Sequence, residues 1–332
     1  MFFSLRGSQA HGLGTDVSLK DPDRLVSSFA SQLSFEHDSN AKVNWLNCHE
    51  RKEGNELDFL GSIFRQLGKE MIKLGLLVAR VCDIGIQGAG LENAILQAST
   101  AKGRLIHYHS LVEKQMLRRI EAGKQRRILE SNKSPPSSHS NKDLWQQWHY
   151  DYGIFTILTM PMFLRSNHTN VDSMDDAHKL NYSSSLETSE SNSLFPHIGL
   201  KILNIGNRMV EFVCAPNDCL LVQVGEAAQI LTGGKLRATA HCVCQPLERD
   251  DVSRETFVVF LQPSWDMCLV SPNEYEMNGK RLESAVLEKE FSMIQCRVPP
   301  LESRWRNGCT FAEFSRETTK QYYGTNGAQA KK

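Results

Sequence analysis

The stretch Trp148–Gly153 reads W-H-Y-D-Y-G and places two metal-binding side chains, His149 and Asp151, two residues apart. Alternate side chains of an extended strand point to the same face, so this imidazole and this carboxylate reach toward one point. Two such groups leave a metal ion only partly coordinated, and we expect a third ligand from elsewhere in the chain. His241, in L-R-A-T-A-H-C-V-C-Q, is the best candidate. Because the chain has 11 histidines, H-x-D alone favours the plainer interpretation, a strand-end His and Asp bonded to backbone.

A second pair of residues, Arg254 and Thr256, shares one face of the apolar strand T-F-V-V-F-L. An arginine on the inward face of such a strand needs an anion to offset the cost of its desolvation. Its planar fork suits a carboxylate, and a neighbouring hydroxyl adds a hydrogen bond. Two histidines and one carboxylate on one face of a metal form the facial triad of non-haem Fe(II) sites. The order H-x-D, distant His, R-x-T therefore indicates a metal with an organic acid beside it.

These motifs resemble those of the 2-oxoglutarate- and Fe(II)-dependent dioxygenases, of the plant type related to isopenicillin N synthase. The matching residues are W-H-Y-D-Y-G-I-F-T-I-L-T, then G-G-K-L-R-A-T-A-H-C-V, then S-R-E-T-F-V-V-F-L-Q-P. They follow the family's order and cover roughly the middle third of the chain. The family usually has R-x-S where this chain has R-x-T, a change that keeps the hydroxyl.

The resemblance implies a mainly β core with flanking helices, in the double-stranded β-helix (jelly-roll, cupin-like) oxygenase fold. It also implies that His149, Asp151 and His241 hold Fe(II), and that Arg254 and Thr256 grip the distal carboxylate of 2-oxoglutarate. The implied reaction uses O2 to hydroxylate, desaturate or demethylate an unknown small organic substrate, with release of succinate and CO2. Beyond the iron site, we expect no catalytic side chain.

Tyr108 lies in R-L-I-H-Y-H, where the family carries an N-x-Y-P motif. The resemblance implies that Tyr108 hydrogen-bonds the oxoacid, and a strand tyrosine at the core boundary is the alternative because the Asn and Pro are absent. Two other functions stay open at this point. One is a non-catalytic binding or regulatory protein of the same fold, and the other is an oxidase of this fold that does not use 2-oxoglutarate.

The composition is ordinary for a globular protein, with 332 residues, 40% hydrophobic residues, 23% charged residues and a formal net charge of zero. Zero net charge predicts no bulk attraction to nucleic acid or to an acidic membrane. No apolar run approaches the roughly 20 residues of a membrane span. The nine cysteines form no C-x-x-C pair and indicate a reducing compartment. We expect a cytoplasmic location, with the nucleus as the alternative, and a small-molecule substrate together with O2 as partners.

The chain divides into three predicted parts. Residues 1–130 form an N-terminal helical or mixed region, shorter than is usual in the resembled family. Residues 142–265 form the oxygenase domain, with a polar insertion at 165–195. Residues 266–332 form a C-terminal helical extension.

Hydrophobic spacing predicts the main helices and strands. Residues 57–82 form the clearest helix, and residues 91–100 form a shorter one. The apolar stripe of the first helix is Leu60, Ile63, Phe64, Leu67, Met71, Leu74, Val78 and Val81. Thr310 and Glu313 fit a capping box at the start of a final helix. Short strands joined by turn residues predict a jelly roll at 104–109, 148–153, 154–164, 198–205, 209–213, 219–224, 236–245 and 256–262.

Overall fold

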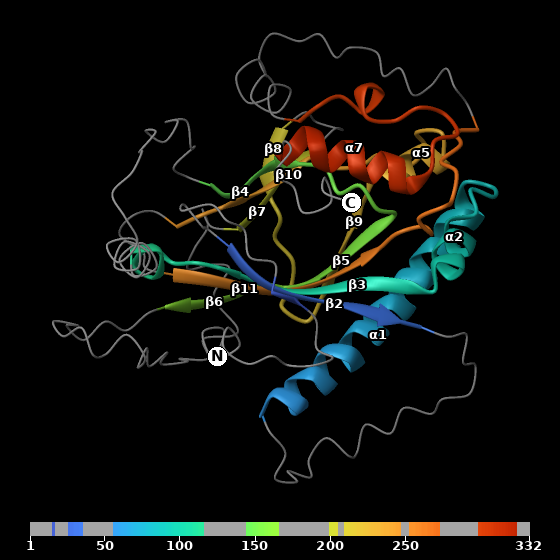
Figure 1. Ribbon diagram of the computed structural model, residues 1–332. Coiled ribbons are helices and arrows are strands. Elements are labelled where there is room, and N and C mark those ends of the chain that lie inside the picture. The colour runs from blue at the N-terminus through green and yellow to red at the C-terminus, as the bar shows by residue number, and fades with distance from the viewer. Residues whose placement is uncertain are drawn as a thin grey trace, which may run out of the picture.

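A computed structural model describes residues 15–16, 26–35, 56–115, 144–165, 199–204, 209–246, 252–272 and 298–323 of the protein. Its centre is two antiparallel β-sheets, with helices against them (Figure 1). Within the described residues, no helix combines the length and the apolar character needed to cross a membrane. The predicted insertion at 165–195 lies outside the described residues, apart from the backbone of Arg165.

The large sheet has the strand order β1-β2-β3-β11-β5-β9, and β6 also pairs with β11. These strands are Thr15–Asp16, Val26–Ser34, Thr100–Tyr108, Val252–Leu261, Phe155–Thr159 and Leu220–Val224, with β6 at Met162–Arg165. The small sheet has the order β4-β10-β7-β8. Its strands are Leu144–His149, His241–Cys244, Gly199–Asn204 and Met209–Phe212.

From β4 to β11 the chain crosses repeatedly between the two sheets, and every pairing is antiparallel. This order closes two four-stranded layers, β3-β11-β5-β9 and β4-β10-β7-β8, into the predicted double-stranded β-helix. The prediction of fold class is confirmed. Strands β1 and β2 extend the large sheet beyond β3. The predicted domain boundaries stay a prediction.

Strand alternation decides which side chains face the space between the sheets. One apolar cluster joins the two layers: Ile106, Tyr108, Trp145, Leu158, Leu200, Val243 and Val258. The neighbouring residues of β11, Phe257 and Val259, belong instead to the cluster that packs under the helices. Because side chains alternate along a strand, Arg254 lies on the inner face with Val258, and Glu255 lies on the outer face with Phe257.

Helix α1 (Glu56–Gly85) covers the outer face of the large sheet (Figure 1). The helix is confirmed, but the predicted stripe is wrong for Ile63, Leu67 and Val81, which are 42%, 38% and 68% exposed. The buried face consists instead of Gly61, Phe64, Gly68, Met71, Ile72, Gly75 and Ala79. Glycines let this face approach the sheet closely, because a Cβ on Gly75 would lie 2.2 Å from Cδ1 of Leu261. A count of large apolar residues misses such contacts.

Further helices are α2 (Leu91–Ala98), α5 (Glu226–Leu231) and α7 (Phe311–Tyr323). The capping box predicted for α7 is confirmed. The Glu313 amide donates to Oγ1 of Thr310 at 3.2 Å, and the Thr310 amide donates to Oε2 of Glu313 at 2.9 Å. Phe311 and Phe314 bury the inner face of α7 against the core.

Candidate metal and acid-binding site

The predicted H-x-D pair meets the distant histidine at one point. His149 ends β4, Asp151 follows it in the loop, and His241 begins β10 directly opposite His149 in the β4–β10 pair. Nε2 of His149 lies 3.9 Å from Oδ1 of Asp151, and Nε2 of His241 lies 3.8 Å from Oδ2. One potential ligand atom from each residue lies within 4.8 Å of the others. The structure therefore brings together the three residues that the sequence singled out.

Both imidazoles are oriented by backbone carbonyls. Nδ1 of His149 lies 2.8 Å from the carbonyl oxygen of Gln147, and Nδ1 of His241 lies 3.0 Å from that of Thr239. A carbonyl only accepts, so each Nδ1 donates its proton and Nε2 of each ring is left facing Asp151. Burial, together with the nearby His241, lowers the pKa of His149 to about 4. His149 is therefore neutral at pH 7.

The loop that carries Asp151 is held by the start of α5. The amide of Glu226 donates to the carbonyl of Asp151 at 2.8 Å, and the amide of Ala227 donates to that of Gly153 at 3.0 Å. Gly225 permits this close approach, because a Cβ there would lie 2.2 Å from the carbonyl oxygen of Gly153. Sequence analysis missed α5, a helix of six residues that is too short for a periodicity to register.

Arg254 is buried in the interior between the sheets, where 2% of it is exposed. Its guanidinium carbon lies 4.9 Å from the ring centroid of Tyr108, its partner in the β3–β11 pair. Nε of Arg254 is buried and has no hydrogen-bond partner in the described structure. Burial lowers the pKa of this guanidinium, although Tyr108 and Glu255 oppose the shift. A buried cation with an unpartnered donor can bind an anion.

Arg254 also lines a cavity of about 20 Å³. Its other walls come from β5, β6, β7 and β9 and the loops beside them: Leu158, Thr159, Met160, Pro161, Phe163, Gly199, Leu200, Val213 and Leu221. This volume holds about one water-sized sphere. A dicarboxylic acid would therefore enter only if the lining side chains rearranged.

Thr256, the predicted companion of Arg254, is buried two residues along β11. Its hydroxyl donates to the carbonyl of Thr159 at 3.2 Å. The hydroxyl proton of Thr256 is therefore already used in a hydrogen bond to β5. Thr256 could bond an acid held by Arg254 only by giving up this contact.

Tyr108 and Gln146 connect the arginine to the histidines. The Tyr108 hydroxyl donates to Oε1 of Gln146 at 2.8 Å, and Nε2 of Gln146 lies 3.0 Å from Nε2 of His149. Arg254 and His149 are therefore joined through two intervening side chains in one interior. Gln146 was missed by sequence analysis, since a glutamine in a strand carries no motif of its own.

Sequence comparisons give no match, either to a protein-family model or to a curated protein. Several solved structures resemble the chain in shape. A full-length protein of Neurospora crassa, solved in complex with alpha-KG and 5-formyluracil, is 13% identical, with a TM-score of 0.47 over 92% of this chain and 74% of that chain. The dioxygenase for auxin oxidation 1 of Arabidopsis thaliana, in a complex with 2-oxoglutarate, is 15% identical, with a TM-score of 0.45 over 82% and 75%. The rice dioxygenase for auxin oxidation is 14% identical, with a TM-score of 0.43 over 79% and 63%.

Proposed function

We propose that this protein is an Fe(II)- and 2-oxoglutarate-dependent dioxygenase that oxidises a small organic substrate. The proposal rests on one observation: two histidines and an aspartate converge inside a jelly roll that also buries an arginine with an unpartnered Nε. We place it in the plant type related to isopenicillin N synthase, on the H-x-D, His and R-x-T motifs. We also propose a cytoplasmic location, on the reducing-compartment signature of its cysteines.

The donor set suits Fe(II). His149 and His241 would each offer Nε2, and Asp151 would offer a carboxylate oxygen, which is the facial triad that leaves positions open for other ligands. When bound, the iron would supply the redox chemistry that couples decarboxylation of 2-oxoglutarate, to succinate and CO2, to oxidation of the substrate by O2. The backbone carbonyls of Gln147 and Thr239 would keep Nε2 of both imidazoles directed at the metal.

Arg254 would bind the distal carboxylate of 2-oxoglutarate. Its fork can form two parallel hydrogen bonds to a carboxylate, which a lysine could not match in geometry. Tyr108 would flank the acid through its ring, and Thr256 would add a hydrogen bond after releasing Thr159. An apolar interior around the acid would exclude water from the oxidation.

An anaerobic titration tests this function without knowledge of the substrate. Purified protein is loaded with Fe(II) and titrated with 2-oxoglutarate, and the visible charge-transfer band of the chelated acid is recorded. We expect a saturable band in the wild type. Arg254→Ala should require at least about tenfold more 2-oxoglutarate for half-saturation, or about 1.4 kcal/mol. Its iron affinity should be unchanged.

Arg65→Ala is the matched control, because Arg65 is exposed on α1 and lies outside the motifs, and it should titrate like the wild type. Iron binding without a band would favour an oxidase of this fold that does not use 2-oxoglutarate. Failure to bind iron would favour a non-catalytic binding or regulatory protein. Equal loss of iron and acid binding in Arg254→Ala would indicate misfolding, and Arg254→Lys would then replace it as the test.

A further inference from the structure

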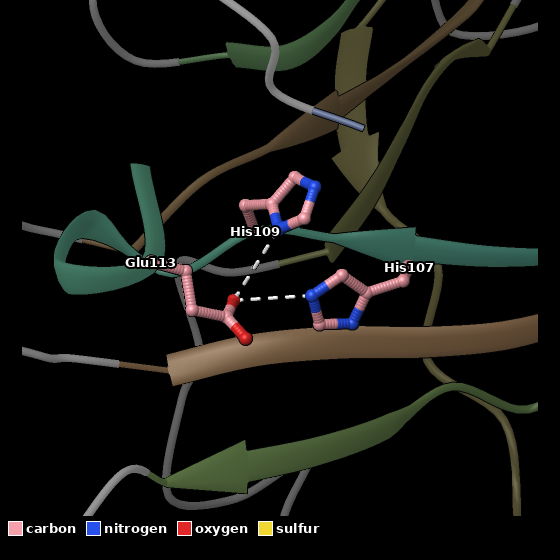
Figure 2. A group of neighbouring side chains, drawn as sticks. All are labelled: His107, His109 and Glu113. Atoms are coloured by element: carbon pink, nitrogen blue, oxygen red, sulfur yellow. Dashed lines mark hydrogen bonds and ion pairs between the residues drawn. The ribbon is translucent and has the colours of Figure 1, made fainter. Parts of the chain in front are cut away.

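A second group of metal-binding side chains lies where β3 ends. His107 is in β3, His109 follows the strand, and Glu113 comes from the helical segment 111–115 (Figure 2). The three side chains are 4%, 3% and 1% exposed. Figure 2 shows both imidazoles turned toward the same carboxylate. Neither the iron site nor the acid-binding site uses these residues.

Two of the three ligand separations are close to those of a tetrahedral metal site. Nε2 of His107 lies 3.1 Å from Oε2 of Glu113, and Nδ1 of His109 lies 3.6 Å from the same oxygen. Zinc bonds to nitrogen and oxygen are about 2.1 Å long, so two ligands of a tetrahedral zinc lie about 3.4 Å apart. The observed separations fall on both sides of this value.

The remaining nitrogen of each imidazole is also held. Nδ1 of His107 hydrogen-bonds the Glu255 carboxylate, and Nε2 of His109 lies 2.8 Å from Oγ of Ser27. Ser27 and Glu255 are the cross-strand partners of His107 in β2 and β11. Metal-bound histidines usually donate their second N–H to such an acceptor, which fixes the ring and raises its basicity. The register of β2, β3 and β11 therefore places hydrogen-bond partners around both imidazoles.

This group lies on the other side of the large sheet from the iron site. Side chains alternate along strands, so His107 and Glu255 point outward where Tyr108 and Arg254 point inward. A single ion could not serve both sets of ligands. A divalent cation would also balance the charge of Glu113 and Glu255, which the helical segment and β11 place beside the imidazoles.

We propose that His107, His109 and Glu113 bind one Zn²⁺ ion in a structural site separate from the iron site. The ion would connect the end of β3 to the helical segment 111–115, and through Glu255 to β11. Three protein ligands leave the fourth tetrahedral position to water or to the second oxygen of Glu113. The site would add stability that is lost when the metal is removed.

A proton is the competing occupant. Without a metal, burial alone would lower the pKa of His107, but its bonds to Glu113 and Glu255 raise it to about 9. The group would then be a buried ion-pair network that needs no metal. The experiment must therefore separate bound zinc from a charged histidine.

Equilibrium dialysis of the Asp151→Ala variant against Zn²⁺, with metal content measured by mass spectrometry, distinguishes a bound zinc ion from a protonated His107. That variant removes one ligand of the iron site and leaves the second group intact. We expect one Zn²⁺ per chain in Asp151→Ala and none in Asp151→Ala/His109→Gln, with zinc raising the melting temperature of the first variant only. Absence of zinc from Asp151→Ala, or equal binding by the double variant, would overturn the proposal.

The same experiment distinguishes the two sites. One ion in both wild type and Asp151→Ala would support the zinc site and contradict the triad, whereas one ion in wild type and none in Asp151→Ala would do the reverse.

Should the His109 variant fail to fold, Glu255→Gln replaces it, since it keeps all three ligands. Loss of this outer carboxylate should weaken zinc binding roughly 10- to 100-fold. Glu70→Gln, at a partly exposed i,i+3 pair with Lys73, is the matched control and should bind like its parent. Unweakened binding in Glu255→Gln would overturn the assignment.

Discussion

Glu226 and Arg304 form a buried, two-point ion pair, with Nη1 of Arg304 2.7 Å from Oε2 and Nη2 2.5 Å from Oε1 of Glu226. Arg304 also donates to the carbonyl of Pro299 and the hydroxyl of Thr318, so the pair holds the segment before α7 and α7 itself. The backbone amide of Glu226 donates to the carbonyl of Asp151. The C-terminal segment is thereby connected to the loop of the proposed iron ligand.

Arg304→Leu should lower the free energy of unfolding by about 3–5 kcal/mol, because it leaves the Glu226 carboxylate buried without its counter-charge. Urea unfolding followed by circular dichroism measures the change. Removing both charges, in Glu226→Leu/Arg304→Leu, should cost less than the sum of the single changes. Arg306→Leu is the exposed control and should stay within about 0.5 kcal/mol of wild type. A loss below about 1 kcal/mol in Arg304→Leu would contradict the importance of the pair.

Gly225→Ala should displace the loop of Asp151, since the added Cβ would collide with the Gly153 carbonyl. We expect iron affinity to fall at least about tenfold, or 1.4 kcal/mol. Gly85→Ala is the matched control, because a Cβ on Gly85 meets nothing within 4 Å. Iron titration of both variants, with circular dichroism to verify the fold, makes the comparison. Wild-type affinity in Gly225→Ala would show that the loop tolerates the displacement.

Tyr108→Phe should affect 2-oxoglutarate binding far less than Arg254→Ala, because the Tyr108 hydroxyl is already bonded to Gln146. It should instead cost about 1 kcal/mol of stability, as Oε1 of Gln146 loses its donor. The anaerobic titration and a urea melt report the two effects separately. Equal loss of acid affinity in both variants would assign the hydroxyl to the acid, as the family resemblance implied.

The capping box of α7 should make stability depend on acid pH. Hydrogen bonds from Thr310 lower the pKa of Glu313 below 4.5, so the folded state binds this proton less readily than the unfolded state. The contribution is therefore complete above pH 4.5 and is lost as pH falls through the folded pKa. The difference in unfolding free energy between wild type and Glu313→Ala should shrink over that range. Thr310→Ser keeps the hydroxyl and should behave like wild type, whereas a pH-independent difference would contradict the assignment.

Local patterns predicted much of the fold and of the proposed iron site. His149, Asp151 and His241 could be found because H-x-D sits at a strand end and the apolar strands around it alternate with period two. The capping box of α7 and the existence of α1 are likewise local. The buried face of α1 was misplaced because glycines, which hydrophobicity does not count, make the closest contacts with the sheet.

Contacts between distant residues could not be predicted in this way. Glu226 and Arg304 are 78 residues apart, and His107 and Glu255 are 148 apart. Their meeting depends on strand register and on how the C-terminal segment returns to the barrel. One amino-acid sequence carries no local signal for the strand register or for the path of the C-terminal segment. His107, His109 and Glu113 are close in sequence, whereas the contact of His107 with Glu255 depends on the pairing of β3 with β11.

Strand β11 carries Arg254 and Glu255 side by side and sends them to opposite faces of the same sheet. On the inner face Arg254 would serve the proposed acid-binding site, and on the outer face Glu255 would serve the proposed zinc site. A slip of one residue would exchange the two side chains, so that a carboxylate would face the proposed acid and a guanidinium would face the proposed zinc ion. The register of one central strand thus decides which charge each proposed site presents.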